Sequence, residues 1–143
     1  MLHSKRNVLV FVTLLSFGFL AFAQHAVIKN VPAKWTPAVS GPAMYQQYCA
    51  VCHGDHAKGN GPLASALKNA PPDLTTLAKA NGGKYPAAHV VSILRFGAAA
   101  PSHGTVEMPV WGPVFKSMNK SNTTEALQRT SNLSRYLETL QVK

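Results

Sequence analysis

The sequence predicts a small all-α domain with long loops, and three observations support this fold class. No stretch alternates apolar and polar residues for long enough to form a β-strand. The apolar positions of the C-terminal segment recur at steps of four and three, which is the spacing of one helix face. The 120 residues that follow an expected N-terminal leader, out of 143, suit one domain and are too few for two.

The expected leader is residues 1–23, which have the layout of a secretory signal peptide. Lys5 and Arg6 give a positive start, an apolar run follows, and the Ala-Phe-Ala triplet at 21–23 has the small-x-small pattern of a cleavage site. An uncleaved membrane anchor is the alternative, but the apolar run is shorter than the roughly 20 residues that span a bilayer. We therefore expect an exported protein, periplasmic in a bacterium, with no stable membrane anchor after cleavage before Gln24.

The first part of the mature chain is expected to contain an arm, a helix and a loop. Residues 24–39 show no periodicity and contain two prolines, so they form an extended arm or linker. Ser40 is a suitable N-cap for a helix over 41–52. Residues 54–62 form a glycine-rich loop. The folded domain is therefore expected to span 40–143.

The later helices are predicted from capping residues and apolar spacing. Pro86 suits the first position of a helix, Gly97 suits the stop that follows it, and Thr123 is expected to cap the last helix. The long loops between these helices need something to wrap around. Before the last helix, the expected helices cover 63–68, 74–80 with Asp73 as its cap, 86–96 with Val90, Ile93, Leu94 and Phe96 as apolar positions, and 113–119.

The chain is basic, with a formal net charge of +9 from 14 Lys and Arg against 5 Asp and Glu. The positive residues are scattered singly, so most of them are expected to form a solvated surface. A nucleic-acid partner is not expected, because the chain is expected to be exported and has no dense run of Lys and Arg. The functional interpretation of the charge is docking to a protein partner with an acidic surface.

The stretch YCAVCHG holds the only two cysteines, Cys49 and Cys52, with His53 directly after the second. A disulfide between them would close a very short loop and add little stability. A thioredoxin-type pair needs a neighbouring parallel sheet, and a structural zinc site needs four ligands. The remaining interpretation of C-x-x-C-H is covalent attachment of one haem c.

The order of these residues agrees with the geometry of a helix. Cys49 and Cys52 lie on one face and can both reach one edge of a flat macrocycle, forming thioethers with its two vinyl groups. His53 then gives a neutral imidazole nitrogen to the iron. Export also agrees, because haem c is attached outside the cytoplasm.

An iron that transfers electrons usually has a sixth ligand, and Met108 is the expected one. It lies in a loop, and Pro109 stiffens the backbone directly after it. Met44 and Met118 are expected within helices, in the core. The rival ligand is His103 in the same loop, while His56 is too close to His53 to reach the far face of the ring and His89 is expected to be exposed.

These residues resemble the class I monohaem cytochromes c over roughly 40–142. The resemblance implies a helical domain wrapped around one covalently attached haem. It also implies that the first and last helices cross closely, and that the carbonyl of Pro62 accepts a hydrogen bond from His53. The segment 71–104 matches the family less well, so Arg95 and Trp111 are candidates for haem propionate contacts by residue type only. The residues that carry the resemblance are Gly41, Tyr45, Cys49, Cys52 and His53, Gly59, Gly61 and Pro62, Met108 and Pro109, and Leu133, Tyr136 and Leu137.

The expected function is that of a one-electron carrier rather than an enzyme. The partners implied are an oxidase, a reductase or a dehydrogenase with an acidic docking surface, and the protein is expected to be a monomer. Two alternatives stay open. One is a haem c subunit bound permanently to a dehydrogenase or oxidase complex, with residues 24–39 as a docking segment. The other is a haem enzyme or sensor with a labile sixth ligand, for which His103 would matter.

Overall fold

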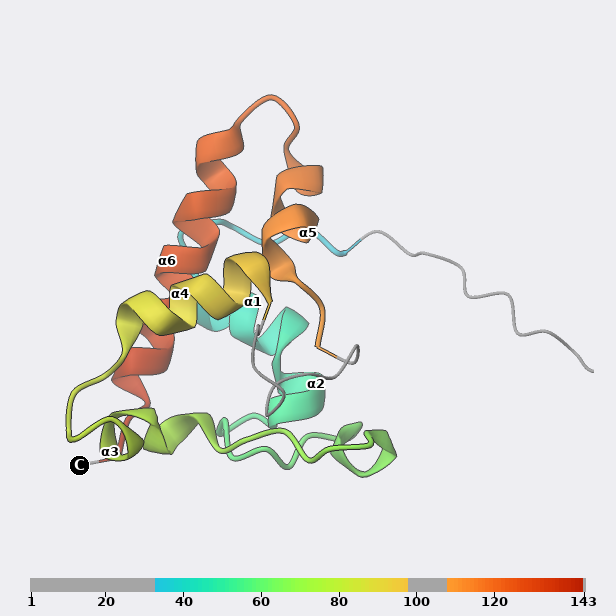
Figure 1. Ribbon diagram of the computed structural model, residues 1–143. Helices are drawn as coiled ribbons and strands as arrows, with labels where there is room; N and C mark the ends of the chain where they lie inside the picture. The colour runs from blue at the N-terminus through green and yellow to red at the C-terminus, as the bar shows by residue number, and fades with distance from the viewer. Residues whose placement is uncertain (1–32, 98–107, 143) are drawn as a thin grey trace, which may run out of the picture. The chain divides into compact units, whose positions relative to one another are not determined.

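A computed structural model describes residues 33–97 and 108–142, and these residues form helices joined by loops, with no strand among them. The all-α prediction is thus confirmed. In Figure 1 the last helix stands upright, α4 and α1 cross it, and the segment that ends in α3 runs across its foot. The elements are α1 (Gly41–Tyr48), α2 (Ala50–His53), η1 (Ala64–Ala66), η2 (Leu74–Thr76), α3 (Leu77–Ala80), α4 (Ala87–Phe96), α5 (Trp111–Met118) and α6 (Thr123–Thr139).

The crossing of α1 and α6 holds the fold together at its centre. A Cβ atom on Gly41 would lie only 2.6 Å from the Cβ of Tyr136, so the two helices touch where glycine has no side chain. The rings of Tyr45 and Tyr136 pack with their centroids 5.5 Å apart, beside the buried Leu133. The close approach expected between the first and last helices is therefore present.

Most of the buried residues of the helices follow the expected apolar faces. Met44 is fully buried, and Met118 packs against the core. Phe96, which was expected among the apolar positions of its helix, is 68% exposed. It follows the buried Leu94 by two residues, which places it about 160° away around the helix.

Several helix boundaries differ from the prediction. The single helix expected over 41–52 is two helices, because the backbone leaves regular helical geometry at Cys49 (φ −113°, ψ −38°). The helix expected over 63–68 is only a short 3-10 turn. The last helix is capped by Asn122 rather than Thr123. The side-chain oxygen of Asn122 accepts hydrogen bonds from the backbone N–H groups of Thr124 and Glu125. Asparagine ranks above threonine as an N-cap, which accounts for the choice.

The segment before α1 is attached to α6 by a buried arginine. Arg129 is 0% exposed and donates to the Thr36 carbonyl oxygen at 2.7 Å and to the Thr36 hydroxyl at 3.1 Å. The same guanidinium pairs with Glu125 at 2.7 Å. Tyr48 completes the cluster, since its hydroxyl lies 2.8 Å from that of Thr36. The part of the expected arm that the structure describes, residues 33–39, contains no helix, and Thr36 within it is fixed to the domain.

Within the two described segments, no helix has both the length and the apolar character needed to cross a membrane.

Candidate functional site

The short helix α2 brings the two cysteines and the histidine together. Cys49 lies between α1 and α2, while Cys52 and His53 form the last two positions of α2. The His53 N–H donates to the Cys49 carbonyl oxygen at 2.8 Å, which closes one helical turn from Cys49 to His53. Both thiols are free and partly exposed. One helical turn therefore presents two unpaired thiols and an imidazole.

The Cys49 thiol does not have the character of a redox-active cysteine. Burial, and to a lesser extent the proximity of Cys52, raises the pKa of the Cys49 thiol to about 12. A thioredoxin-type cysteine works as a thiolate and has a lowered pKa. The part of the chain that the structure describes also contains no cluster of three or more His, Cys, Asp or Glu side chains suited to a metal ion. Cys49 is therefore not a reactive thiolate, and the described residues provide no such cluster for a zinc ion.

His53 is held in the neutral form and in one orientation. Its side chain is only 8% exposed, and this burial lowers the pKa of the imidazole despite an opposing effect from the Pro72 carbonyl. The Nδ1 atom lies 3.3 Å from the Pro72 carbonyl oxygen. With Nδ1 donating that hydrogen bond, Nε2 keeps its lone pair, and no other described residue bonds to it. This is the state in which an imidazole binds a metal.

The hydrogen-bond partner of His53 is thus Pro72, and the expectation that Pro62 would fill this role was wrong. The backbone around Pro62 is engaged elsewhere: the Gly61 N–H donates to the Cys52 carbonyl at 3.0 Å, and the Leu63 N–H donates to the Val51 carbonyl at 2.9 Å. The loop after α2 therefore closes the end of that helix. Nothing in the local sequence indicates that a residue 19 positions beyond His53 returns to its ring.

Two glycines allow the loop to lie directly on its neighbours. Gly59 has φ +77°, and a Cβ atom there would collide with the Pro71 carbonyl oxygen. A Cβ atom on Gly61 would lie 2.6 Å from the Val51 carbonyl oxygen. The Gly59 N–H also donates to the His53 carbonyl at 2.8 Å. The loop therefore links α2 to the segment whose Pro72 orients the imidazole.

Trp111 and Arg95 are the two residues whose type suits contact with a haem propionate, and they lie in different surroundings. Trp111 is buried and stacks on Phe115, with centroids 5.5 Å apart, and its ring packs at a tilt against that of Tyr48, with centroids 5.3 Å apart. No other described residue accepts a hydrogen bond from its indole N–H, so this donor is available to a ligand. Arg95 lines a groove between α4, α5 and α6 to which neither the cysteines nor His53 contribute.

Among the methionines of the described segments, Met108 is the one outside a helix. Its side chain is 39% exposed and it precedes α5, whereas Met44 and Met118 belong to the core and its edge. The sulfur of Met118 already has a neighbour, the Tyr48 hydroxyl at 3.9 Å. His56 and His89 are exposed. The rival ligand His103 lies outside the described residues.

A family model described as cytochrome c oxidase, cbb3-type, subunit III matches residues 36–123, which is more than half of the chain. No curated protein and no solved structure was found to match the chain. The matched segment includes α2 and both of the prolines that follow the glycine-rich loop.

Proposed function

Since the chain belongs to the family described as "cytochrome c oxidase, cbb3-type, subunit III", we propose that it is a one-electron carrier with a single haem c. This is a cytochrome c family, and its domain indicates electron transfer by haem c. We propose His53 and Met108 as the axial ligands of the haem iron. Cys49 and Cys52 would hold the haem covalently. The observation that supports this most strongly is the buried, neutral His53, held through Nδ1 and directly preceded by two free thiols on one helical turn.

The residues of the site fit this group. The free thiols of Cys49 and Cys52 are available for thioethers, and the raised pKa of the Cys49 thiol agrees with a structural rather than a redox role for that residue. The indole N–H of Trp111 is a buried donor without a protein partner in the described segments, which suits the carboxylate of a propionate. Arg95 has no such position, so we propose Trp111 alone as a propionate contact.

The protein's own contribution is to orient the ligands and to exclude water. When bound, haem c supplies the electron by alternating its iron between Fe(II) and Fe(III). Pro72 fixes the plane of the His53 ring and keeps the proton on Nδ1, so that Nε2 remains the donor nitrogen. Tyr48 directly precedes Cys49, and its aromatic cluster with Trp111 and Phe115 would provide an apolar, low-dielectric surround for the group. Such a surround favours the less charged state of a redox centre and raises its reduction potential.

Met108 is proposed as the sixth ligand because its thioether is not used in the core. Its exposure and its place before Pro109 support this assignment. A thioether ligand gives a higher reduction potential than a second imidazole. His103 is the alternative, and it would favour the haem enzyme or sensor.

The family description also favours a second candidate function, a permanent subunit of an oxidase complex. In that case the partner is fixed rather than transient, and the protein still carries electrons without catalysing a reaction itself. An exported, periplasmic location is proposed for both candidates, because cytochromes c receive their haem outside the cytoplasm. A free monomeric carrier would purify alone, whereas a subunit would purify with a larger partner.

The optical spectrum of the haem-loaded protein tests the ligand assignment. We expect the oxidised protein to show the weak far-red sulfur-to-iron charge-transfer band, and Met108→Leu to abolish this band while the thioether-type haem spectrum remains. Met118→Leu is the matched control, since it changes the other partly exposed methionine, and it should keep the band. If Met108→Leu retains the band, Met108 is not the ligand.

A further inference from the structure

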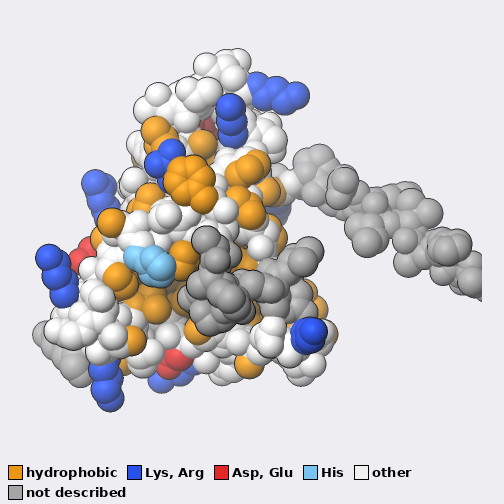
Figure 2. Space-filling view, in the orientation of Figure 1, with side chains coloured by type: hydrophobic (Ala, Val, Ile, Leu, Met, Phe, Trp, Pro, Cys, Tyr) orange, Lys and Arg blue, Asp and Glu red, His pale blue; other side chains and the backbone are white. Residues whose placement is uncertain are grey.

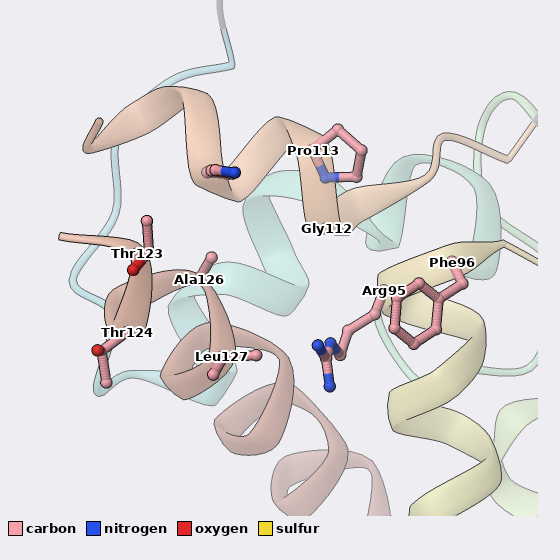
Figure 3. A pocket seen from close by; sticks show the side chains of 9 residues that line it. Arg95, Phe96, Gly112, Pro113, Thr123, Thr124, Ala126 and Leu127 are labelled. Atoms are coloured by element: carbon pink, nitrogen blue, oxygen red, sulfur yellow. The ribbon is translucent and has the colours of Figure 1, made fainter. Parts of the chain in front are cut away.

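A groove lies between the end of α4 and the starts of α5 and α6, on a surface separate from Cys49, Cys52 and His53. Its volume is about 600 Å³, which is within the range of ligand-binding clefts. Figure 3 shows the side chains of Arg95 and Leu127 pointing toward one another across it. The residues that give the groove its character are Arg95, Phe96, Pro113, Lys116, Ala126 and Leu127.

The floor of the groove is preformed. Gly112, in the first turn of α5, lies directly on the last turn of α4, because a Cβ atom there would be 3.1 Å from the Arg95 Cα and would collide with the Arg95 carbonyl oxygen. Ala126, in the first turn of α6, is buried. The two helix starts and the end of α4 are therefore held in contact by backbone and small residues, and the groove does not need to be opened by a partner.

Large apolar side chains are exposed at this groove. Phe96 is 68% exposed and Leu127 is 45% exposed. Figure 2 shows hydrophobic side chains between Lys and Arg side chains on the face formed by α4, α5 and α6. Exposed apolar side chains around a hollow and bordered by polar groups are typical of interaction sites.

The groove is also positively charged without compensation from the described residues. The Arg95 guanidinium lies over the Phe96 ring, 4.7 Å from its centroid, which holds the cation in place but leaves its N–H donors free. No Asp or Glu lines the groove. In residues 33–97 and 108–142 the one ion pair is Arg129–Glu125, so neither Arg95 nor Lys116 is neutralised there.

We propose that this groove binds a segment of a partner protein that carries an apolar side chain next to carboxylates. The apolar side chain would pack between Phe96 and Leu127, and the carboxylates would pair with Arg95 and Lys116. A concave site with one exposed aromatic ring suits a protein segment better than a lipid surface, which binds broad amphipathic faces. The contact would tether a partner away from the residues proposed to hold the haem.

The probe for this proposal is a helical peptide of about 14 residues. This is roughly the length at which a helix begins to persist in water. The peptide has leucines along one face bordered by glutamates, and its matched control has glutamine in place of each glutamate. Binding to the isotope-labelled, reduced, haem-loaded protein is followed by NMR chemical-shift changes. We expect the changes to be confined to the end of α4, to α5 and to the start of α6, and the glutamine peptide to bind about tenfold more weakly.

Variants of the protein separate the charged from the apolar contribution. Arg95→Gln and Lys116→Gln are each expected to weaken binding of the glutamate peptide about fivefold, and Leu127→Gln to weaken it about tenfold. Lys79→Gln, which removes an exposed lysine from α3, should leave the affinity unchanged. Unshifted signals from the rest of each variant show that it is folded.

Three results would overturn the proposal. One is the absence of binding at millimolar peptide, and another is binding that maps to a different face or that none of the groove variants weakens. The third is binding to vesicles rich in phosphatidylglycerol through the same signals without binding to the peptide, which would make the groove a membrane contact. None of these results bears on Met108, because the ligand assignment is read from the optical spectrum.

Discussion

At the scale of single residues, Gly59 has a larger role than its place in a loop indicates. It combines φ +77° with a Pro71 carbonyl oxygen in the place that a Cβ atom would need, so any side chain is both strained and obstructed. Gly59→Ala is expected to lower the free energy of unfolding by about 3 kcal/mol, measured by denaturant titration. Gly83→Ala is the control, because Gly83 has φ +88° with open space around it, and it should cost only about 1 kcal/mol. Equal losses in the two variants would show that the Pro71 contact does not matter.

The residues of the candidate site differ in how far the sequence could predict them. The C-x-x-C-H motif is local, so its spacing alone predicts that Cys49, Cys52 and His53 share one turn, which the structure has. Pro72 was missed because the partner of His53 is chosen by the path of a long loop, which has no periodic signal. Arg129 was missed for another reason: a lone arginine on an amphipathic helix usually faces solvent, and only the tertiary structure shows Thr36 beside it.

At the scale of elements, α6 is attached to the segment before α1 through one guanidinium. Arg129 donates to Thr36 and to Glu125 at the same time, in a geometry that requires the planar fork of arginine. Arg129→Lys should therefore destabilise the protein by about 3 kcal/mol and raise the exposure of the neighbouring Trp35, followed by its fluorescence. Arg135→Lys, on the exposed side of the same helix, should change stability by less than about 0.5 kcal/mol. A similar small effect for both variants would contradict the role given to Arg129.

The same cluster makes the start of α6 sensitive to acid. Hydrogen bonds from Asn119 and Arg129, together with the charge of Arg129, lower the pKa of the Glu125 carboxyl from its usual value of 4.5. Because this pKa is lower in the folded than in the unfolded state, the stabilisation is complete above about pH 4.5 and is lost as the pH falls through the folded-state pKa. Glu125→Gln is expected to flatten the acid limb of a stability-against-pH curve. Glu138→Gln, an exposed change on the same helix, should leave that limb as steep as in the parent protein.

The helices were predicted where their apolar spacing is regular, and their ends were not. The faces of α4 and α6 follow from steps of three and four residues, and most of their expected apolar positions are buried, although Phe96 is exposed. Two helix boundaries were not predicted. One is the break at Cys49, and the other is the N-cap of α6, for which the adjacent Asn122 and Thr123 are both suitable residues. Such choices are made by small free-energy differences at the helix ends, to which the apolar pattern is insensitive.

At the scale of the whole molecule, two features bear on function. The long loops indicate that the helices surround a central group, and the positive charge indicates that the protein attracts anionic partners. Few helices and long connections leave the protein dependent on a central group, which the expected haem c would provide. Two of the 14 Lys and Arg lie in the expected leader, so the rest of the chain still has a net charge of +7. A charge of this size creates a field that attracts anions over distances limited by salt.

This field can be tested before any natural partner is known, by using small redox reagents of opposite charge. The rate constant for oxidation of the reduced, haem-loaded protein by the anion ferricyanide is expected to fall about threefold to tenfold as the ionic strength rises from about 0.01 to 0.1 M. Over this range the Debye length shrinks from about 30 Å to about 10 Å, so the attraction reaches less far. A cationic cobalt complex is the control, and its rate constant should stay level or rise. A ferricyanide rate that does not respond to salt would mean that the positive field does not reach the site of electron transfer, and an acidic docking partner would then lose its main support.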